Sequence, residues 1–164
     1  MDCLTDKQQK ACTYFLLGDI MAMTTQCHCG RIKIEIPSIP KVLNDCRCTL
    51  CYKLGGLWAY YPRDTVHISN CSPSSPLSPM PQDDERREIK TANDEALRSY
   101  TRADIPPGPE AHREGPLSGY RCAHCGALTH WWRQNNDESA KMGVNCRLLT
   151  EGEIEGIEVE INRI

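Results

Sequence analysis

The sequence predicts a mainly β protein built from short strands. Several segments alternate polar and apolar residues with a period of two, and others are rich in aromatic and β-branched residues. Proline, glycine and polar residues separate these segments, and we find no pattern of a long amphipathic helix. A succession of short strands with turn residues between them is typical of folds dominated by β-sheets.

Individual elements follow from these patterns. Residues 31–36 alternate strictly and end before Pro37, which predicts a half-buried strand. Residues 57–61 are rich in strand-forming residues and are stopped by Pro62. A single helical turn is expected at residues 151–154. Further strands are predicted at residues 65–68, 96–100, 127–132, 141–149 and 156–161.

The length of 164 residues predicts a single domain. We expect residues 1–22 to be a poorly ordered N-terminal extension and residues 23–164 to form the domain. The segment near 72–90 combines Ser and Pro with a charged run, a composition that cannot support a core, so we expect a mobile loop. The segment 105–119 is rich in Pro and Gly and is expected to be a second irregular insertion.

Charge and cysteine content narrow the functional classes. The net charge of -3 disfavours nucleic acid and anionic membranes as partners, because proteins that bind phosphates usually carry a basic patch. No apolar run approaches the ~20 residues that span a bilayer, and the first residues lack the features of a secretory signal. The 11 cysteines are an odd number and cluster in short motifs, which favours metal binding over a disulfide framework. We therefore expect a reducing, cytoplasmic location.

Two short cysteine motifs, each followed by glycine, predict a structural zinc site. Cys27 and Cys29 precede the first predicted strand, and Cys122 and Cys125 precede a late one. Each motif is a tight turn that directs two thiolates to one side, and the glycine after it lets the backbone turn back. Two such turns supply four sulfur ligands, which is the closed set of a structural zinc. Such a site would join the first part of the sheet to the last.

A third motif contains Cys46, Cys48 and Cys51. A loop this short can place three sulfurs on one face of a metal ion. Without a fourth cysteine nearby, the fourth position is left for water or substrate, as in catalytic zinc sites. In the other interpretation, a distant side chain completes a second structural zinc. The spacing alone leaves both interpretations open, and the candidates for the distant ligand are Cys71, Cys146, His28 and His67.

Histidines and aromatic residues are the remaining candidates for a site. His67 alternates with Val66 and Ile68, so we expect it to be exposed on a strand. For His124 and His130, an ordinary surface or packing role is favoured over a role in a site. Trp58, Tyr60, Trp131 and Trp132 could together line an amphipathic cleft, but for each of them singly we favour packing in the core.

The motifs, taken in order, match those of one known family. They are Cys27-His28-Cys29-Gly30; Cys46-Arg47-Cys48-Thr49-Leu50-Cys51 with Gly55-Gly56; Tyr120-Arg121-Cys122-Ala123-His124-Cys125-Gly126; and Met142-Gly143-Val144-Asn145-Cys146-Arg147. With these residues the chain resembles the glutathione-dependent formaldehyde-activating family, also called the centromere protein V family. The resemblance runs from about Met23 to the C-terminus, broken by the two insertions, which are longer than the family leads us to expect.

The resemblance implies a fold and two metal sites. The fold is a β-tent of the Mss4-like type, with short antiparallel sheets tied by a four-cysteine zinc site. The implied cofactor is Zn²⁺, with two ions per chain. The second ion is catalytic, which favours the open interpretation of the third motif. The implied ligands are Cys27, Cys29, Cys122 and Cys125 for the structural ion and Cys46, Cys48 and Cys51 for the catalytic ion.

The named activity of the family is carbon–sulfur lyase chemistry. S-(hydroxymethyl)glutathione forms from, or breaks into, glutathione and formaldehyde, so the resemblance implies a small thiol and a small aldehyde as partners. Glutathione carries carboxylates, and Arg47 and Lys53 are the basic residues nearest the third motif, with Arg121 beside another. The alternative function is a non-catalytic, zinc-stabilised protein-interaction module in which both ions are structural.

Overall fold

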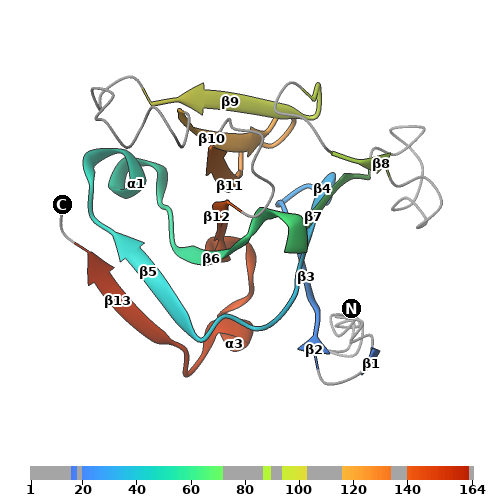
Figure 1. Cartoon of the computed structure of the whole chain (residues 1–164). Coiled ribbons are helices and arrows are strands. Elements are labelled where there is room, and N and C mark those ends of the chain that lie inside the picture. The colour runs from blue at the N-terminus through green and yellow to red at the C-terminus, as the bar shows by residue number, and fades with distance from the viewer. Residues whose placement is uncertain are drawn as a thin grey trace, which may run out of the picture.

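The computed structural model describes residues 16–17, 20–71, 87–89, 94–102, 116–133 and 140–162, which form three sheets (Figure 1). A seven-stranded sheet has the order β13-β5-β6-β12-β11-β10-β9, and a four-stranded sheet has the order β3-β4-β7-β8. Strands β1 and β2 pair with each other alone. The prediction of a mainly β fold is confirmed.

Most strands are short. The seven-stranded sheet contains β5 Val42–Cys46, β6 Trp58–Pro62, β9 Leu97–Thr101, β10 Leu117–Cys122, β11 Leu128–Arg133, β12 Lys141–Asn145 and β13 Glu158–Asn162. The other two sheets contain β1 Leu16–Leu17, β2 Ile20–Met21, β3 Met23–Gln26, β4 Ile32–Ile36, β7 His67–Asn70 and β8 Arg87–Glu88. The helical elements are α1 Thr49–Leu54, α3 Glu151–Ile154 and the 3-10 turns Arg63–Thr65 and Cys146–Leu148.

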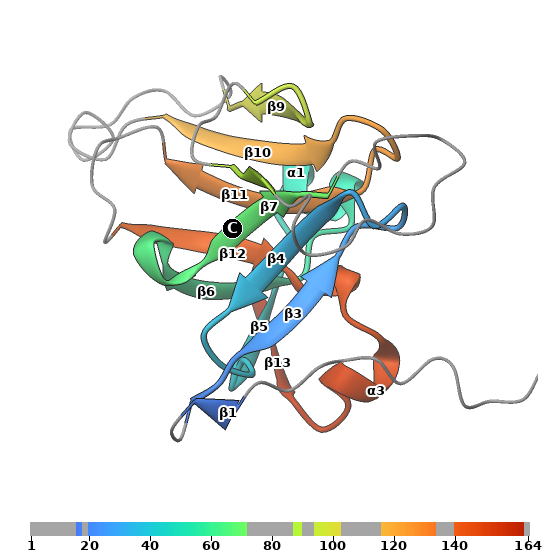
Figure 2. The same cartoon turned by 90° about the vertical axis from the view of Figure 1, so that its right-hand side faces the viewer.

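The four-stranded sheet lies across one side of the seven-stranded sheet (Figure 2). Strand β4 shows why the two pack together, because its three isoleucines are buried and its Lys33 and Glu35 are only partly so. Ile32, Ile34 and Ile36 belong to one hydrophobic core with residues of β10 and β12, such as Tyr120 and Met142. The alternation at residues 31–36 therefore predicts the strand and its buried face correctly.

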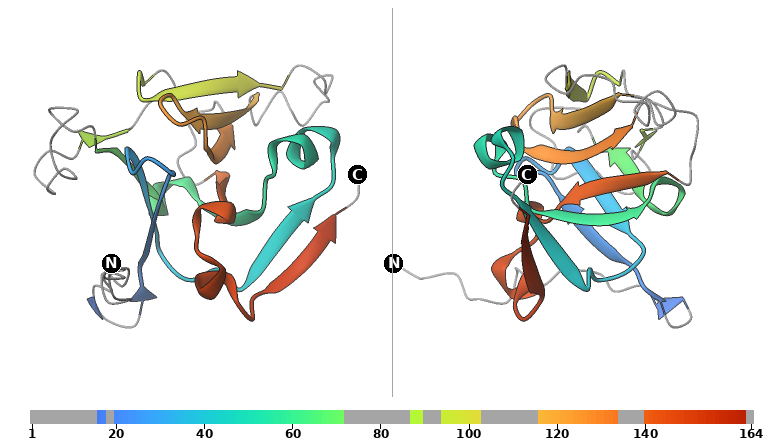
Figure 3. Two further views of the ribbon diagram at one scale, coloured as in Figure 1. Left: turned by 180° about the vertical axis from the view of Figure 1, so that it is seen from behind. Right: turned by 60° about the vertical axis from the view of Figure 1, so that its left-hand side comes forward.

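The seven-stranded sheet curls, so that its two ends form separate wings. In Figure 1 and in the left view of Figure 3, β5 and β13 form one wing and β9 to β11 the other. The short helix α1 follows β5 and lies near the β9–β11 wing. This arrangement matters for function because the third cysteine motif lies at the end of β5 and in α1.

Several predicted segments differ from the observed elements. Strand β5 and helix α1 were not expected, and β5 pairs with β13 in parallel, so the expectation of short antiparallel sheets does not hold for this pair. Strand β10 begins at Leu117, inside the segment 105–119 that was expected to be irregular. Strand β8 and the buried Ile89 lie inside the segment 72–90 that was expected to be a mobile loop. Ile89 donates its N–H to the carbonyl of Ile68, which holds this part of the segment against β7. The other residues of that loop lie outside the described part of the chain.

The remaining predictions need smaller adjustments. The strand expected at 141–149 ends at Asn145, where a 3-10 turn begins. The strand expected at 65–68 begins at His67. The last predicted strand exists as β13, but all five of its residues are exposed. Most of the expected extension 1–22 lies outside the described residues, although β1 and β2 fall within it. Among the described residues, no helix has the length and apolarity to cross a bilayer.

Candidate metal centres

Two groups of cysteines can each hold a metal ion. The first contains Cys27, Cys29, Cys122 and Cys125, and the second contains Cys46, Cys48 and Cys51. Within each group, the sulfur atoms all lie within 4.8 Å of one another. The structure thus brings together the same cysteines that the sequence motifs single out.

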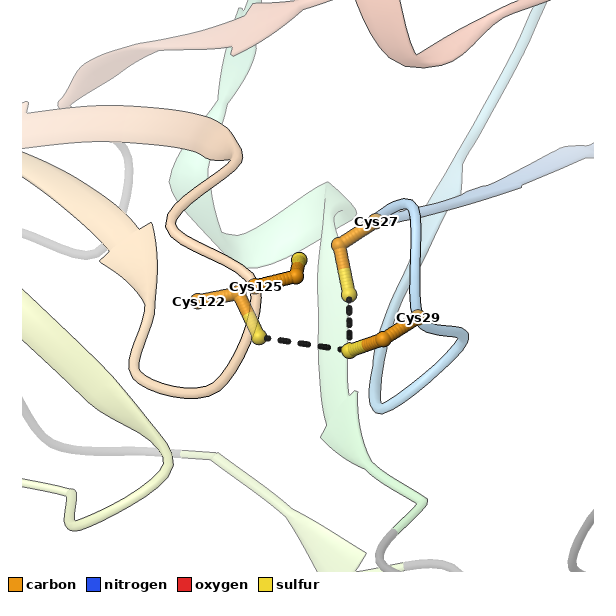
Figure 4. Close-up of side chains that lie close together, drawn as sticks. All are labelled: Cys27, Cys29, Cys122 and Cys125. Carbon is orange, nitrogen blue, oxygen red and sulfur yellow. Dashed lines mark hydrogen bonds between the residues drawn. The ribbon is translucent and has the colours of Figure 1, made fainter.

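The four-cysteine group joins the two main sheets. Cys27 and Cys29 lie in the turn between β3 and β4, and Cys122 and Cys125 lie at the turn between β10 and β11 (Figure 4). The sulfur of Cys29 is 3.5 Å from that of Cys27 and 3.7 Å from that of Cys122. In a tetrahedron with metal–sulfur bonds of about 2.3 Å, sulfur atoms are about 3.8 Å apart. The observed spacing therefore fits four sulfurs around one ion.

The backbone of both turns is shaped by glycine. Gly30 and Gly126 have φ angles of 74° and 75°, in the left-handed region that glycine adopts without a Cβ clash. Gly30 donates its N–H to the carbonyl of Cys27, and Gly126 donates to that of Cys122. Both turns thus have the tight geometry that the glycine after each motif predicts.

Backbone N–H groups also point at the sulfurs. The N–H of Ile32 donates to the sulfur of Cys27 at 3.2 Å. Burial nevertheless raises the pKa of the Cys27 thiol. At Cys125 burial also acts to raise the pKa, but hydrogen bonds from the backbone at Ala127 and Cys29 outweigh it and lower the pKa to about 6. N–H donors of this kind stabilise thiolates, which are the form that binds metals.

The three-cysteine group is built by the β5–α1 junction. Cys46 ends β5, which is held in register by its parallel pairing with β13. Cys48 is the N-cap of α1, and its sulfur accepts from the N–H of Cys51 at 3.5 Å. Cys51 lies one turn further along, so its side chain returns to the same side. The helix ends at Gly55, whose φ of 69° allows the chain to leave in a new direction.

The three-cysteine group has no fourth protein ligand among the described residues. No other Cys, His, Asp or Glu there offers a ligand atom within 4.8 Å of all three sulfurs. The distant candidates Cys71, Cys146, His28 and His67 therefore do not join it. Instead, the indole N–H of Trp58 donates to the sulfur of Cys51 at 3.4 Å. Burial raises the pKa of Cys51 to about 12, and the Trp58 hydrogen bond opposes this effect.

A cavity of ≈ 150 Å³ opens beside the three-cysteine group. Cys46 and Cys51 form part of its wall, and Leu50 and Leu54 of α1 line it together with residues of the sheet. Trp58, Tyr60 and Trp131 line it, as in the cleft interpretation, although packing in the core was favoured for each of them. Trp132 does not, because it is buried against Tyr120 and His130 in the core.

The basic residue at this cavity is one that the motifs do not indicate. Arg102, which follows β9, is the one cation among the described lining residues. Arg47 is paired with Asp45 and lies over the ring of Tyr52 instead. Arg47, Lys53 and Arg121 are not among the described residues that line the cavity. Arg102 is far from the three-cysteine group in the sequence, and the pairing of β9 with β10 brings it to the cavity. Nearness in sequence to the cysteines could therefore not identify it.

The histidines have the roles expected of surface and packing residues. His67 is exposed on β7 and lies 3.7 Å from the carboxylate of Glu88. His130 is fully buried and stacks on Tyr120 with a ring separation of 4.7 Å. His124 lies in the β10–β11 turn and borders a surface cavity with Arg31 and Arg98.

Asn145 is a structural residue of the site that we did not predict. Its side-chain oxygen accepts from the N–H of Leu57, and its amide donates to the carbonyl of Leu128. It is 3% exposed and faces Trp58 across the β12–β6 pair. These bonds fix the strand that carries Trp58 to β11. The available signal was an asparagine within the strand expected at residues 141–149, because such a side chain needs internal partners when it is buried.

Comparisons with known proteins identify the fold only. No protein-family model matches the chain, and no curated protein matches its sequence. Among solved structures, the crystal structure of a Rhodobacter sphaeroides protein from structural genomics matches with a TM-score of 0.50. The two chains are 18% identical, and the match covers 84% of this chain and 100% of the other. The two proteins thus have similar folds, and the metal and the reaction must be argued from the residues.

Proposed function

We propose that the chain is a zinc-dependent carbon–sulfur lyase of the Mss4-like, glutathione-dependent formaldehyde-activating type. The observation that carries this proposal is the three-cysteine group, which faces a cavity and lacks a fourth protein ligand among the described residues. A closed structural site would need that fourth ligand. The ordered cysteine motifs add support, because they resemble those of this family from the first motif to the last.

The donor set fits zinc at both groups. Four sulfurs suit a structural ion held by Cys27, Cys29, Cys122 and Cys125, and three sulfurs with an open position suit a catalytic ion held by Cys46, Cys48 and Cys51. When bound at the open site, zinc would lower the pKa of a substrate thiol, so that its sulfur is held as the reactive thiolate.

The chain's own residues would orient the two reactants. The substrate sulfur forms a bond to the carbonyl carbon of the aldehyde, the π electrons move to the oxygen, and the oxygen takes a proton. Reversal of these steps releases thiol and aldehyde. Tyr60 supplies the one hydroxyl among the described lining residues and can donate a hydrogen bond to that oxygen. Arg102 is placed to pair with a carboxylate of the thiol.

Thiol binding at the three-cysteine group is the first test. In protein loaded with Co²⁺, glutathione should strengthen the sulfur-to-metal charge-transfer absorption, and Cys48→Ser should abolish this change. The exchange between formaldehyde, glutathione and their adduct should then run faster with the wild type than with Cys48→Ser at equal concentration. The variant is the necessary control, because this exchange also proceeds without enzyme.

Arg102→Gln and its control Arg47→Gln form a matched pair of variants that tests how the substrate carboxylates are bound. Arg102→Gln should raise the half-saturating glutathione concentration about tenfold or more, since a hydrogen bond to a charged group is lost. Arg47→Gln should leave it nearly unchanged, because Arg47 is not among the described residues that line the cavity. Equal exchange rates for wild type and Cys48→Ser would contradict the lyase proposal. Absence of thiol binding, with a fourth protein ligand on that metal, would favour the interaction module.

A further inference from the structure

Two tryptophans form the walls of the cavity because each lies against a glycine. A Cβ atom at Gly56 would lie 2.6 Å from the indole of Trp58. A Cβ atom at Gly143 would lie 2.1 Å from the indole nitrogen of Trp131. Both distances are shorter than side chains tolerate, so only glycine permits these ring positions. The two indoles meet edge to face with centroids 6.5 Å apart.

A third glycine leaves space open beside this pair of tryptophans. Gly119 lies on β10 directly opposite Trp131 and also lines the cavity. A Cβ atom at Gly119 would have no neighbour within 4 Å. Trp131 is therefore flanked by a glycine on each neighbouring strand, and its ring covers only Gly143. The cavity volume exists in part because position 119 has no side chain.

The size and lining of this space favour an apolar, planar group. Indoles and leucines, among them Leu117 and Leu128 from the strands, make up most of the lining, and Arg102 supplies its one cation among the described residues. Apolar cavities of about this size in other proteins bind benzene. Formaldehyde contributes a single carbon to its adduct and would leave most of the ≈ 150 Å³ without contacts.

We infer that the site takes thiol adducts in which the former carbonyl carbon bears a benzene-sized apolar group, seated above Gly119 and against the edge-to-face pair of Trp58 and Trp131. This inference rests on the proposed function for the position of the adduct's sulfur beside Cys46 and Cys51. It differs from that function in the substrate class, because the selected carbonyl compound is an aromatic aldehyde rather than formaldehyde. Aromatic rings pack edge to face and offset against indoles, as this pair of walls allows.

Two stable thioethers test the inference without catalysis. S-benzylglutathione and S-methylglutathione differ only in the group on sulfur, and their binding to the full chain can be measured by titration calorimetry. We expect the benzyl compound to bind about tenfold more tightly or better, because the ring buries apolar surface in the cavity. It should also quench tryptophan fluorescence, since Trp58 and Trp131 contact the ring.

Substitutions of glycine locate the effect. Gly119→Leu should fill the space and reduce the preference for the benzyl compound to about twofold or less. Gly119→Ala adds a single carbon where there is room and should reduce it partially in a folded protein. Gly152→Leu is the matched control, because Gly152 lies in α3, also has no neighbour within 4 Å of its Cβ position and does not line the cavity.

The result separates this inference from the proposed function. Equal affinities for the two thioethers, failure of both to bind, or a preference that persists in both Gly119 variants would overturn the inference. None of these results depends on a rate measurement. A strong benzyl preference without faster adduct exchange would instead support the substrate class and contradict the lyase activity.

Discussion

The buried imidazole of His130 is an unusual residue in a core of this kind. Its side chain is fully buried, with its ring stacked on that of Tyr120, the ring of Trp132 tilted against both, and the hydroxyl of Thr129 3.0 Å from Nδ1. Among the described residues, no group bonds to its Nε2. Burial, with a smaller contribution from the charge of Arg63, lowers its pKa to about 3. The folded protein therefore keeps this histidine neutral in mildly acidic solution.

His130 should make the protein less stable as the pH falls below about 6.5. In that range the unfolded chain binds a proton at this histidine, whereas the folded chain does not until the pH nears 3. Each pH unit within this window costs about 1.4 kcal/mol of the free energy of unfolding. Urea unfolding of wild type and His130→Phe at about pH 7 and about pH 5.5 measures the effect.

The comparison of the two proteins isolates the histidine from other acid effects. Protonation of metal-binding cysteines would weaken both proteins alike, so only the difference in their pH dependence reports on His130. The variant should lose less stability than the wild type on acidification. The same loss in both would show that His130 accepts a proton in the folded state.

The residues of the candidate site were predictable to different degrees. All seven cysteines could be assigned because ligand type and short spacing are local properties of the sequence. Tyr60 and both cavity tryptophans were candidates on residue type, with packing in the core favoured for each, and nothing separated them from Trp132, which faces the core. Arg102 could not be found in this way. Its place depends on β9 pairing with β10, and the local spacing of residues does not predict which distant segments pair.

At the scale of elements, the three strands β10, β11 and β12 place Trp131 between two glycines. Gly119, Trp131 and Gly143 are aligned in the antiparallel register of these strands. The indole leans over Gly143 and away from Gly119. The two glycines therefore differ in what a methyl group would encounter, although both lie next to the same tryptophan.

Gly143→Ala should destabilise the protein by about 1–3 kcal/mol, the usual cost of overpacking. The new methyl group would displace the indole of Trp131, so the tryptophan fluorescence of the folded state should change as well. Gly119→Ala is the control, and its free energy of unfolding should stay within about 0.5 kcal/mol of the wild type. Denaturant unfolding of both variants provides the measurement. A similar loss at both positions would mean that Trp131 does not hold the observed orientation.

The strands that were missed share a physical cause. Strand β5 has an exposed valine, one buried leucine and three partly buried polar or cysteine residues, so it shows no alternation. Its pairing with β6 and β13 defines it instead. Strand β10 buries Ser118, whose hydroxyl bonds to that of Thr101. It also contains Gly119, which lines the cavity. In β5 and β10, residues that serve a site or a partner strand thus interrupt the alternation of polar and apolar residues. In β4 that alternation is intact, and it predicts the strand.

At the scale of the whole molecule, the two cysteine groups have different positions in the architecture. The four-cysteine group connects the turn between β3 and β4 to the turn between β10 and β11, so it links the two main sheets. The three-cysteine group lies within a single segment at the end of β5 and the start of α1. With zinc at both groups, loss of the first would release a long-range connection, whereas loss of the second would release only a local loop.

Cys122→Ser should therefore remove the cooperative thermal transition, because the free energy of binding such an ion, about 10–16 kcal/mol in small zinc domains, is also free energy of folding. Cys48→Ser should melt within a few degrees of the wild type, at about 2–5 °C lower at most, and contain one zinc ion fewer. Cys71→Ser is the control, because Cys71 belongs to neither group and should keep both ions. Calorimetry and metal analysis of the three variants give the answer. Equal destabilisation by Cys122→Ser and Cys48→Ser would show that both ions hold the fold together, which would contradict an open, catalytic site at the β5–α1 junction.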